Sequence, residues 1–370
     1  MVSTEQETIP TESAVDTPAR PVTSYRTDLV TVLLGTWFTV GLMVDAWAHN
    51  NVPQLETFFT PWHAVFYWGF IVTAGWILWT CRPAFRGGRL PDFRAMPVGY
   101  PASVVALGAF ALSGFLDFLW HTVFGVEQNI DILFSPSHLG LVTSMLVIVT
   151  TPLRTAWARR TAEPVTGLRA LLPAVLSMAL AATLVLLFLQ YANALVFRPG
   201  SIVVALTDLE EFHTSNVVTS ILVTNAVLII PLLTLAKRWT LPVGSATVLY
   251  AVIGALCAAI AGFENLELIA GLLVAGVLVD LAALWLRPSA ARPARLRAYA
   301  ALAGLLTWAV YLATAVLTAP PLAPMVDGAA TRFVPEIYTG VPVVQALFGL
   351  LLAVVLVPVA APPAEPAASA

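Results

Sequence analysis

The sequence contains little charge. Only 11% of its 370 residues are Asp, Glu, Lys or Arg, whereas soluble domains carry roughly a quarter. Lys237 is the single lysine, and no basic stripe with interleaved aromatic residues runs along the chain. The composition therefore excludes water as the solvent for most of the surface, and no nucleic-acid partner is expected.

Cysteine is also scarce. The two cysteines, Cys81 and Cys257, lie far apart in the sequence. Two such thiols form neither a disulfide framework nor a Cys-x-x-Cys metal or redox motif. We expect both to be ordinary buried side chains.

Apolar residues, in contrast, are abundant: 59% of the chain is hydrophobic and the mean hydropathy is +0.85. Apolar stretches of about 20 residues are long enough to cross the hydrocarbon core of a bilayer as helices. The predicted fold class is all-α, a polytopic transmembrane helical bundle of about ten spans whose main partner is the lipid bilayer. The spans are expected near 28–49, 61–81, 101–122, 136–153, 170–194, 213–236, 242–262, 267–286, 298–318 and 338–359.

The chain divides into four predicted parts. Residues 1–27 are polar and rich in Thr, Glu and Pro, and they are expected to form a disordered cytoplasmic tail. Residues 28–153 contain two helical hairpins that resemble each other, and residues 154–359 contain the remaining transmembrane helices. The Ala/Pro-rich residues 360–370 are expected to form a second disordered tail.

Basic residues are concentrated between alternate spans. They precede span 1 and follow spans 2, 4, 6 and 8, whereas the opposite side retains only Arg198 and Arg332. An excess of Lys and Arg marks the cytoplasmic side of a membrane protein. We therefore predict that both termini are cytoplasmic, in an integral protein of a prokaryotic plasma membrane. The basic residues predicted on the cytoplasmic side are Arg20, Arg26, Arg82, Arg86, Arg89, Arg94, Arg154, Arg159, Arg160, Arg169, Lys237, Arg238, Arg287, Arg292, Arg295 and Arg297.

The first two hairpins carry the same polar pattern. Span 1 ends in Asp45-x-x-x-His49 and span 3 ends in Asp117-x-x-x-His121, 72 residues later. Span 2 opens with Thr-Pro-x-His63 and span 4 opens with Ser-Pro-x-His138, 75 residues later. Asp and His four residues apart share one helix face, where they can bind one ion or where the acid can orient the imidazole.

The Thr-Pro and Ser-Pro pairs have the residue types of a helix N-cap followed by the first helical position. They place His63 and His138 in the first helical turn, where the helix dipole disfavours the charged imidazolium. Neutral imidazole is the form that coordinates metal. We therefore predict a metal site built from Asp45, His49, His63, Asp117, His121 and His138, at the extracytoplasmic ends of their helices.

Further polar residues are predicted on the same side of the membrane. Glu56, Glu127 and Asp131 lie in the two hairpin loops, and Glu210, Glu211 and His213 precede or begin span 6. They are candidates for groups that support the metal ligands or carry protons. The alternative is that the acids are solvated loop residues and that each histidine is hydrogen-bonded to a loop carbonyl.

Histidine with carboxylate suits copper(II), zinc or non-haem iron, whereas copper(I) selects Cys and Met. Asp45-x-x-x-His49 with His63, and Asp117-x-x-x-His121 with His138, resemble the Asp-x-x-x-His…His copper site in the C subunit of the particulate methane/ammonia monooxygenase family. That family places such ligands in transmembrane helices near the outer side of the membrane. The resemblance is confined to the motif and its helix pair, and here the motif is doubled. It implies copper at these residues.

The leading expectation is thus a membrane metalloprotein that binds one or two copper ions, with an oxidoreductase or monooxygenase-like activity to be considered. A second class is a metal or ion transporter, or a protein that delivers metal to an extracytoplasmic partner or enzyme; Asp280 in span 8 is the one acid that hints at an ion path. A b-type haem protein with two histidine ligands and a zinc-dependent membrane hydrolase are further alternatives.

Overall fold

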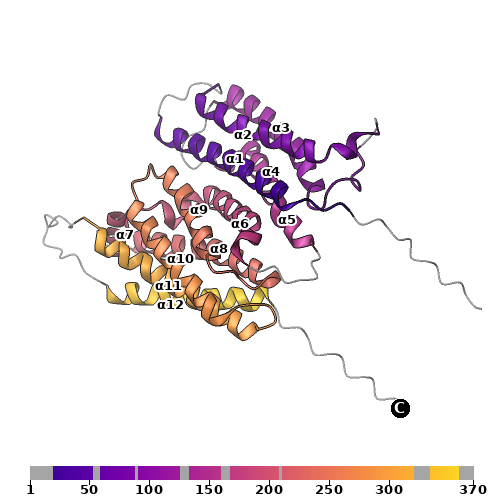
Figure 1. Ribbon diagram of the computed structural model, residues 1–370. Coiled ribbons are helices and arrows are strands. Elements are labelled where there is room, and N and C mark those ends of the chain that lie inside the picture. The colour runs from indigo at the N-terminus through magenta and orange to yellow at the C-terminus, as the bar shows by residue number, and fades with distance from the viewer. Residues whose placement is uncertain are drawn as a thin grey trace, which may run out of the picture.

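The computed structural model describes residues 20–52, 59–87, 91–125, 133–159, 167–207, 211–320 and 334–357, and these residues form helices and connections without a strand (Figure 1). The α-helices are α1 (Tyr25–Asn51), α2 (Pro61–Thr80), α3 (Pro101–Phe124), α4 (Pro136–Val149), α5 (Thr151–Ala158), α6 (Leu168–Phe188), α7 (Pro199–Thr207), α8 (Glu211–Arg238), α9 (Ser245–Ile260), α10 (Leu266–Leu286), α11 (Pro293–Thr318) and α12 (Pro335–Leu356). Short 3₁₀ helices are formed by Arg82–Phe85, Gln190–Ala192 and Ala194–Val196.

Eight helical segments in the described part of the chain are long and apolar enough to cross a membrane. They are α1, α3, α4 together with α5, α6, α8, α10, α11 and α12. The predicted all-helical, membrane-embedded class is therefore supported, whereas the predicted count of about ten is not reached. The two further predicted spans coincide with α2 and α9.

These two helices differ from the other spans for separate reasons. Helix α9 has 16 residues, which at 1.5 Å per residue gives about 24 Å, less than the roughly 30 Å of the hydrocarbon core. Helix α2 has 20 residues, and Trp, Tyr, Thr and His are interspersed among its apolar residues. Helix α7 was not predicted as a separate helix; its nine residues lie between the helices of spans 5 and 6.

The helix of span 4 is interrupted at Thr150, between α4 and α5. Pro152 follows at the start of α5, and a proline has no N–H to donate to the preceding turn. The hydroxyl of Thr151 instead donates to the carbonyl of Ile148 at 2.6 Å, and Arg154 donates to that of Val147 at 2.8 Å. The break is therefore a local change of helix geometry with its backbone carbonyls still hydrogen-bonded.

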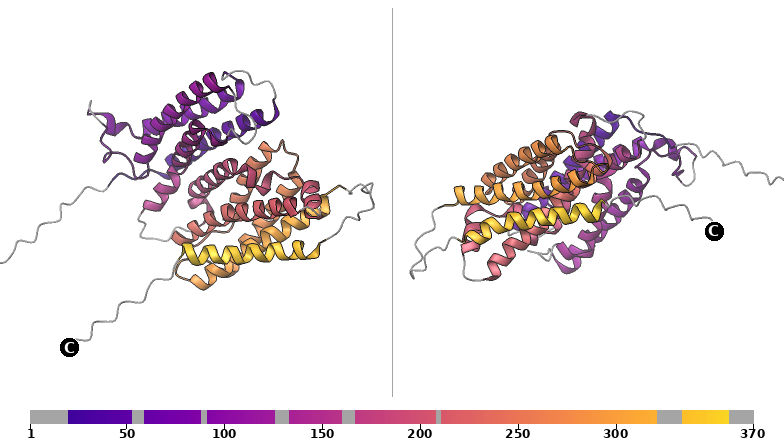
Figure 2. Two further views of the ribbon diagram at one scale, coloured as in Figure 1. Left: turned by 180° about the vertical axis from the view of Figure 1, so that it is seen from behind. Right: turned by 90° about the horizontal axis from the view of Figure 1, so that it is seen from below.

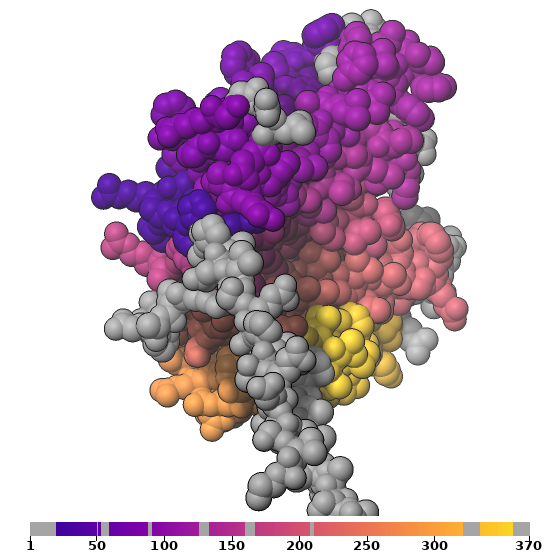
Figure 3. Space-filling view, turned by 90° about the vertical axis from the view of Figure 1, so that its right-hand side faces the viewer, coloured from indigo at the N-terminus to yellow at the C-terminus, as the bar shows by residue number. Residues whose placement is uncertain are grey.

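The buried apolar side chains form two clusters. One joins α1 to α4 with inward faces of α6 and α9, and the other joins α6 to α12. Figure 1 shows α1 to α4 grouped on one side of the molecule, with α6 and α9 next to them, and Figure 2 shows the same grouping from two further directions. In the space-filling view of Figure 3, the salmon-coloured part of the chain lies between the indigo-to-magenta part above and the orange and yellow parts below. Helices α6 and α9 therefore join the two halves.

Helices α1 and α2 cross at very close range. A Cβ atom placed on Gly41 would lie 2.8 Å from the Cα of Phe66, and one placed on Gly69 would lie 2.8 Å from the Cα of Phe38. Phe38 and Phe66 stack with ring centroids 5.4 Å apart. Only glycine allows the two backbones to approach this closely, as is common where membrane helices pack.

The carboxylate of Asp280, on α10, caps the beginning of α9. It accepts hydrogen bonds from the backbone N–H groups of Ala246 at 3.0 Å and Thr247 at 2.9 Å, and from the Thr247 hydroxyl at 2.6 Å. The residue before α9 is Gly244, which has no side chain to act as a cap. Asp280 thus satisfies N–H groups that the first turn of a helix otherwise leaves unpaired.

Candidate metal centre

The first candidate site, here called the first triad, consists of Asp45, His49 and His63. Asp45 and His49 lie in the last two turns of α1, and His63 lies in the first turn of α2. The Nε2 atoms of His49 and His63 lie 3.9 and 3.4 Å from Oδ2 of Asp45. One carboxylate oxygen is therefore flanked by two imidazole nitrogens from adjacent helices.

The second triad consists of Asp117 and His121 on α3 and His138 on α4. Oδ1 of Asp117 lies 3.7 Å from Nε2 of His121 and 3.0 Å from Nε2 of His138. The hydroxyl of Ser137 also hydrogen-bonds to Asp117, and Nδ1 of His121 lies 3.3 Å from the carbonyl oxygen of Gly125. A hydrogen bond to the second ring nitrogen fixes the orientation of a ligating imidazole.

Helix caps position the third residue of each triad. The hydroxyl of Thr60 accepts the backbone N–H of His63 at 3.1 Å, and that of Ser135 accepts the N–H of His138 at 3.3 Å. A proline is the first residue of both helices. The predicted N-caps are therefore confirmed, and both histidines occupy the third helical position beside the carboxylate of the neighbouring helix.

The separation of the ligand atoms suits a metal ion. With metal–nitrogen and metal–oxygen distances of about 2.0–2.1 Å, tetrahedral ligands lie about 3.3–3.4 Å from one another. The nitrogen–oxygen distances in the triads span 3.0 to 3.9 Å, and all ligand atoms of a triad lie within 4.8 Å of one another. Three ligands per triad leave at least one coordination position for another ligand.

The carboxylates are buried, so keeping them ionised requires a nearby positive charge. Asp45 is 7% exposed and Asp117 is 1% exposed. An ionised carboxylate in an apolar interior costs several kcal/mol unless a positive group compensates it. A proton, an imidazolium or a metal ion could supply that charge, and the flanking nitrogens make a metal ion chemically suitable.

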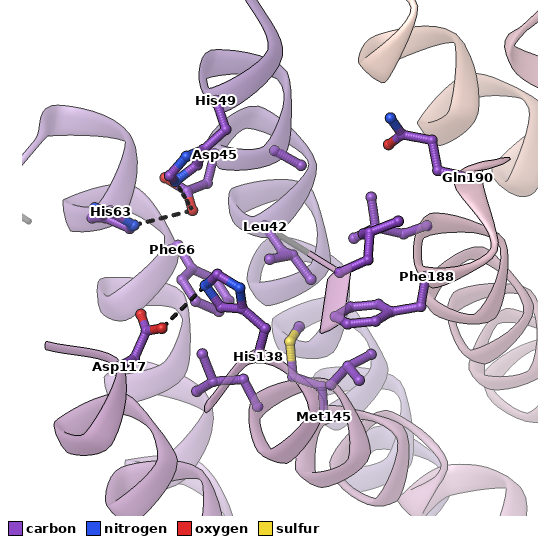
Figure 4. Close-up of a pocket in the computed structure, with 15 residues that line it drawn as sticks. Leu42, Asp45, His49, His63, Phe66, Asp117, His138, Met145, Phe188 and Gln190 are labelled. Atoms are coloured by element: carbon purple, nitrogen blue, oxygen red, sulfur yellow. Dashed lines mark ion pairs between the residues drawn. The ribbon is translucent and has the colours of Figure 1, made fainter. Parts of the chain in front are cut away.

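The two triads are neighbours. The rings of His49 and His121 stack with centroids 6.3 Å apart, and those of His63 and His121 lie 6.2 Å apart. Five of the six triad residues also line one cavity of about 60 Å³, shown in Figure 4. A water molecule needs roughly 10–15 Å³ of such space, so the cavity accommodates a few waters or one small molecule.

Among the residues that the structure describes, the remaining wall of the cavity is almost entirely apolar. Phe66, Met145 and Phe188 are among the residues that form it, and Gln190 is the one polar member outside the triads. In Figure 4 the amide of Gln190 lies across the cavity from Asp45 and His63. The other lining residues are Leu42, Ala46, Leu133, Leu141, Val142 and Leu187.

Of the residues predicted to support the metal ligands, those that the structure describes are not found at the triads. Glu56, Glu127, Asp131 and Glu210 lie outside the described residues. Glu211 and His213 are exposed at the start of α8, and neither belongs to a triad. Among the described residues, the structure therefore brings together all six predicted ligands but not His213.

Ser137 and the cavity wall from the end of α6 were not predicted from the sequence as parts of the site. Ser137 occupies the position of Trp62 in the first hairpin, so a comparison of the two hairpins shows no shared polar residue there. Leu187 and Phe188 lie in an ordinary apolar helix, and nothing in their local sequence distinguishes a cavity wall from a lipid-facing surface.

Comparison with known proteins adds no assignment: no family model matches the sequence, and no curated protein or solved structure is significantly similar to it. The functional argument therefore depends on the two triads and their surroundings.

Proposed function

We propose that the protein is an integral membrane metalloprotein that binds copper at the two Asp-His-His triads, near the extracytoplasmic face. The observation that supports this most is the convergence of Asp45, His49 and His63 from two consecutive helices, and the same convergence around Asp117 in the second hairpin. Two imidazoles and one carboxylate suit copper(II), zinc and non-haem iron. The resemblance of both motifs to the monooxygenase copper site favours copper among them.

An oxidoreductase role is the activity that this proposal favours. Each triad supplies three ligands, so a bound ion keeps a position for a small molecule from the adjoining cavity. Apart from Gln190, the described wall residues outside the triads are apolar and offer water few hydrogen-bond partners there. The protein would supply the ligands, their orientation through the Thr60 and Ser135 caps, and the shape of the cavity.

Transport of an ion across the bilayer is less well supported than binding. Asp280, the acid that suggested an ion path, caps α9 with both carboxylate oxygens. A haem group between two imidazoles is disfavoured because a porphyrin is far larger than a cavity of about 60 Å³. A zinc-dependent hydrolase uses the same ligand types and differs in the metal that is retained.

Metal analysis of the full chain purified in detergent tests the proposal. We expect copper in the wild-type protein and its loss in the His49→Ala/His121→Ala double variant. His213→Ala is a matched control, because it removes an exposed histidine outside the triads, and we expect it to retain the copper. Absence of copper from the wild type, or equal copper in the double variant, would refute the assignment; zinc alone would favour the hydrolase.

The proposed orientation has a separate test. Asn51 follows the first triad at the end of α1, and Arg94 lies in the basic connection before α3; both are exposed. Native Cys81 and Cys257 are buried, so they should contribute little background. A membrane-impermeant maleimide should label Asn51→Cys in intact cells, and Arg94→Cys only after permeabilisation. The reverse pattern would place the triads on the cytoplasmic side.

A further inference from the structure

We infer that the two triads form one dinuclear metal centre rather than two independent sites. This inference rests on the proposed metal binding and adds the number of ions and their mutual arrangement. It assigns both hairpins to a single functional unit, with the ions facing a common cavity.

The distances between imidazole rings carry the first step. Within the triads, the ring centroids are 5.5 Å apart for His49 and His63, and 5.7 Å apart for His121 and His138. Between the triads, His121 lies 6.3 Å from His49 and 6.2 Å from His63. Rings that would bind different ions are therefore almost as close as rings that would bind the same ion.

The position of His121 explains this closeness. Its ring is surrounded by the other three imidazoles, and it comes from α3, whose end lies beside α1 and α2 at the site. Its Nδ1 atom faces the Gly125 carbonyl and its Nε2 atom faces Asp117. His121 is thus oriented as a ligand of the second triad while its ring packs against the first.

The charges of the buried carboxylates are consistent with one ion in each of the two neighbouring triads. Each triad contains its own buried carboxylate, Asp45 or Asp117. A single divalent ion in one triad would leave the other carboxylate dependent on its imidazoles or on a proton. Two ions give each carboxylate a direct counter-charge, which reduces the repulsion between the ions in the weakly polar interior.

The cavity provides a shared open side. Asp45, His49 and His63 of the first triad line it together with Asp117 and His138 of the second. In Figure 4 the side chains of His63 and His138 approach the same space from opposite hairpins. A small molecule held there, against Phe66 and Met145, would lie beside both ions at once.

Electron paramagnetic resonance of the full chain, titrated with copper(II) in detergent, tests the inference. We expect two copper ions per chain. As the second equivalent binds, a half-field transition should appear, or the double-integrated signal should fall below the bound copper, because two nearby spins interact. In the His49→Ala/His63→Ala and His121→Ala/His138→Ala variants we expect one ion per chain and loss of either effect.

The outcomes separate the inference from the proposal on which it rests. Absence of bound copper would refute the metal assignment itself. One ion per wild-type chain, or two ions whose spectrum is the sum of two isolated sites, would overturn the dinuclear centre while leaving copper binding intact. The wild-type titration decides between these results even if a double variant does not fold. His213→Ala should reproduce the wild-type spectrum throughout.

Discussion

The close crossing of α1 and α2, one helical turn from the first triad, should set the distances between the ligand atoms of that triad. Gly41→Ala would place a Cβ atom 2.8 Å from the Cα of Phe66, whereas carbon atoms pack favourably at about 3.5–4.0 Å. The helices must therefore separate locally by roughly 0.7–1.2 Å. Asp45 and His63 each lie about one turn from this contact, and their ligand atoms are 3.4 Å apart.

A displacement of this size exceeds the tolerance of about 0.2 Å expected for metal–ligand distances. We expect Gly41→Ala to weaken copper binding at the first triad by about 10–100-fold, the range typical of changes in groups that orient metal ligands. The second triad should keep its affinity. Overpacking should also lower the free energy of unfolding by about 1–3 kcal/mol.

The measurement is a copper titration against a competing chelator, with the thermal midpoint of unfolding recorded in parallel. Gly75→Ala is the matched control: Gly75 is also a helical glycine, on α2, but a Cβ placed there has no heavy atom within 4 Å. It should leave both affinities unchanged. Equal affinities in Gly41→Ala, Gly75→Ala and the wild type would show that this helix contact does not set the ligand geometry.

Three further outcomes follow from the same structure. Asp117→Asn replaces a buried anionic residue that is a proposed ligand, so the second triad should lose copper while the first retains one ion per chain. Elemental analysis would measure this, and two retained ions per chain would contradict the ligand assignment. Copper occupancy should fall when the pH is lowered from about 7.5 to about 5.5, because protons compete for the imidazole nitrogens; occupancy at equilibrium that does not change over this range would argue against histidine ligands. Asp280→Ala removes three hydrogen bonds at the start of α9 and should lower the free energy of unfolding by about 1–3 kcal/mol. The number of copper ions per chain should not change, and a lower number would mean that Asp280 has a further role.

Much of the fold could be predicted because the bilayer restricts a chain of this composition to helices of limited length. The helix starts at Pro61 and Pro136 were predictable for a local reason, since a capping hydroxyl precedes each proline. The shortness of α9 was not, because its apolar sequence continues beyond the helix at Ala261 and its beginning depends on a carboxylate from α10. That contact has no local signature.

The same distinction applies to the site. The spacing from Asp45 to His49 places both side chains on one helix face, so two of the three residues of each triad followed from helical periodicity alone. The approach of His63 depended on pairing α1 with α2, which a short hairpin loop makes probable in any helical protein. Contact between the triads through His121 required the packing of two hairpins, which no spacing within either motif encodes.

Two parts of the chain form the cavity beside the triads, and only one of them contains triad residues. All six triad residues precede residue 140, whereas Leu187, Phe188 and Gln190 line the cavity from α6 and the 3₁₀ turn after it. Substitutions in this second group change the space and polarity next to the triads without removing a triad residue. The molecules that the cavity admits could therefore diverge over evolution while the proposed metal ligands are conserved.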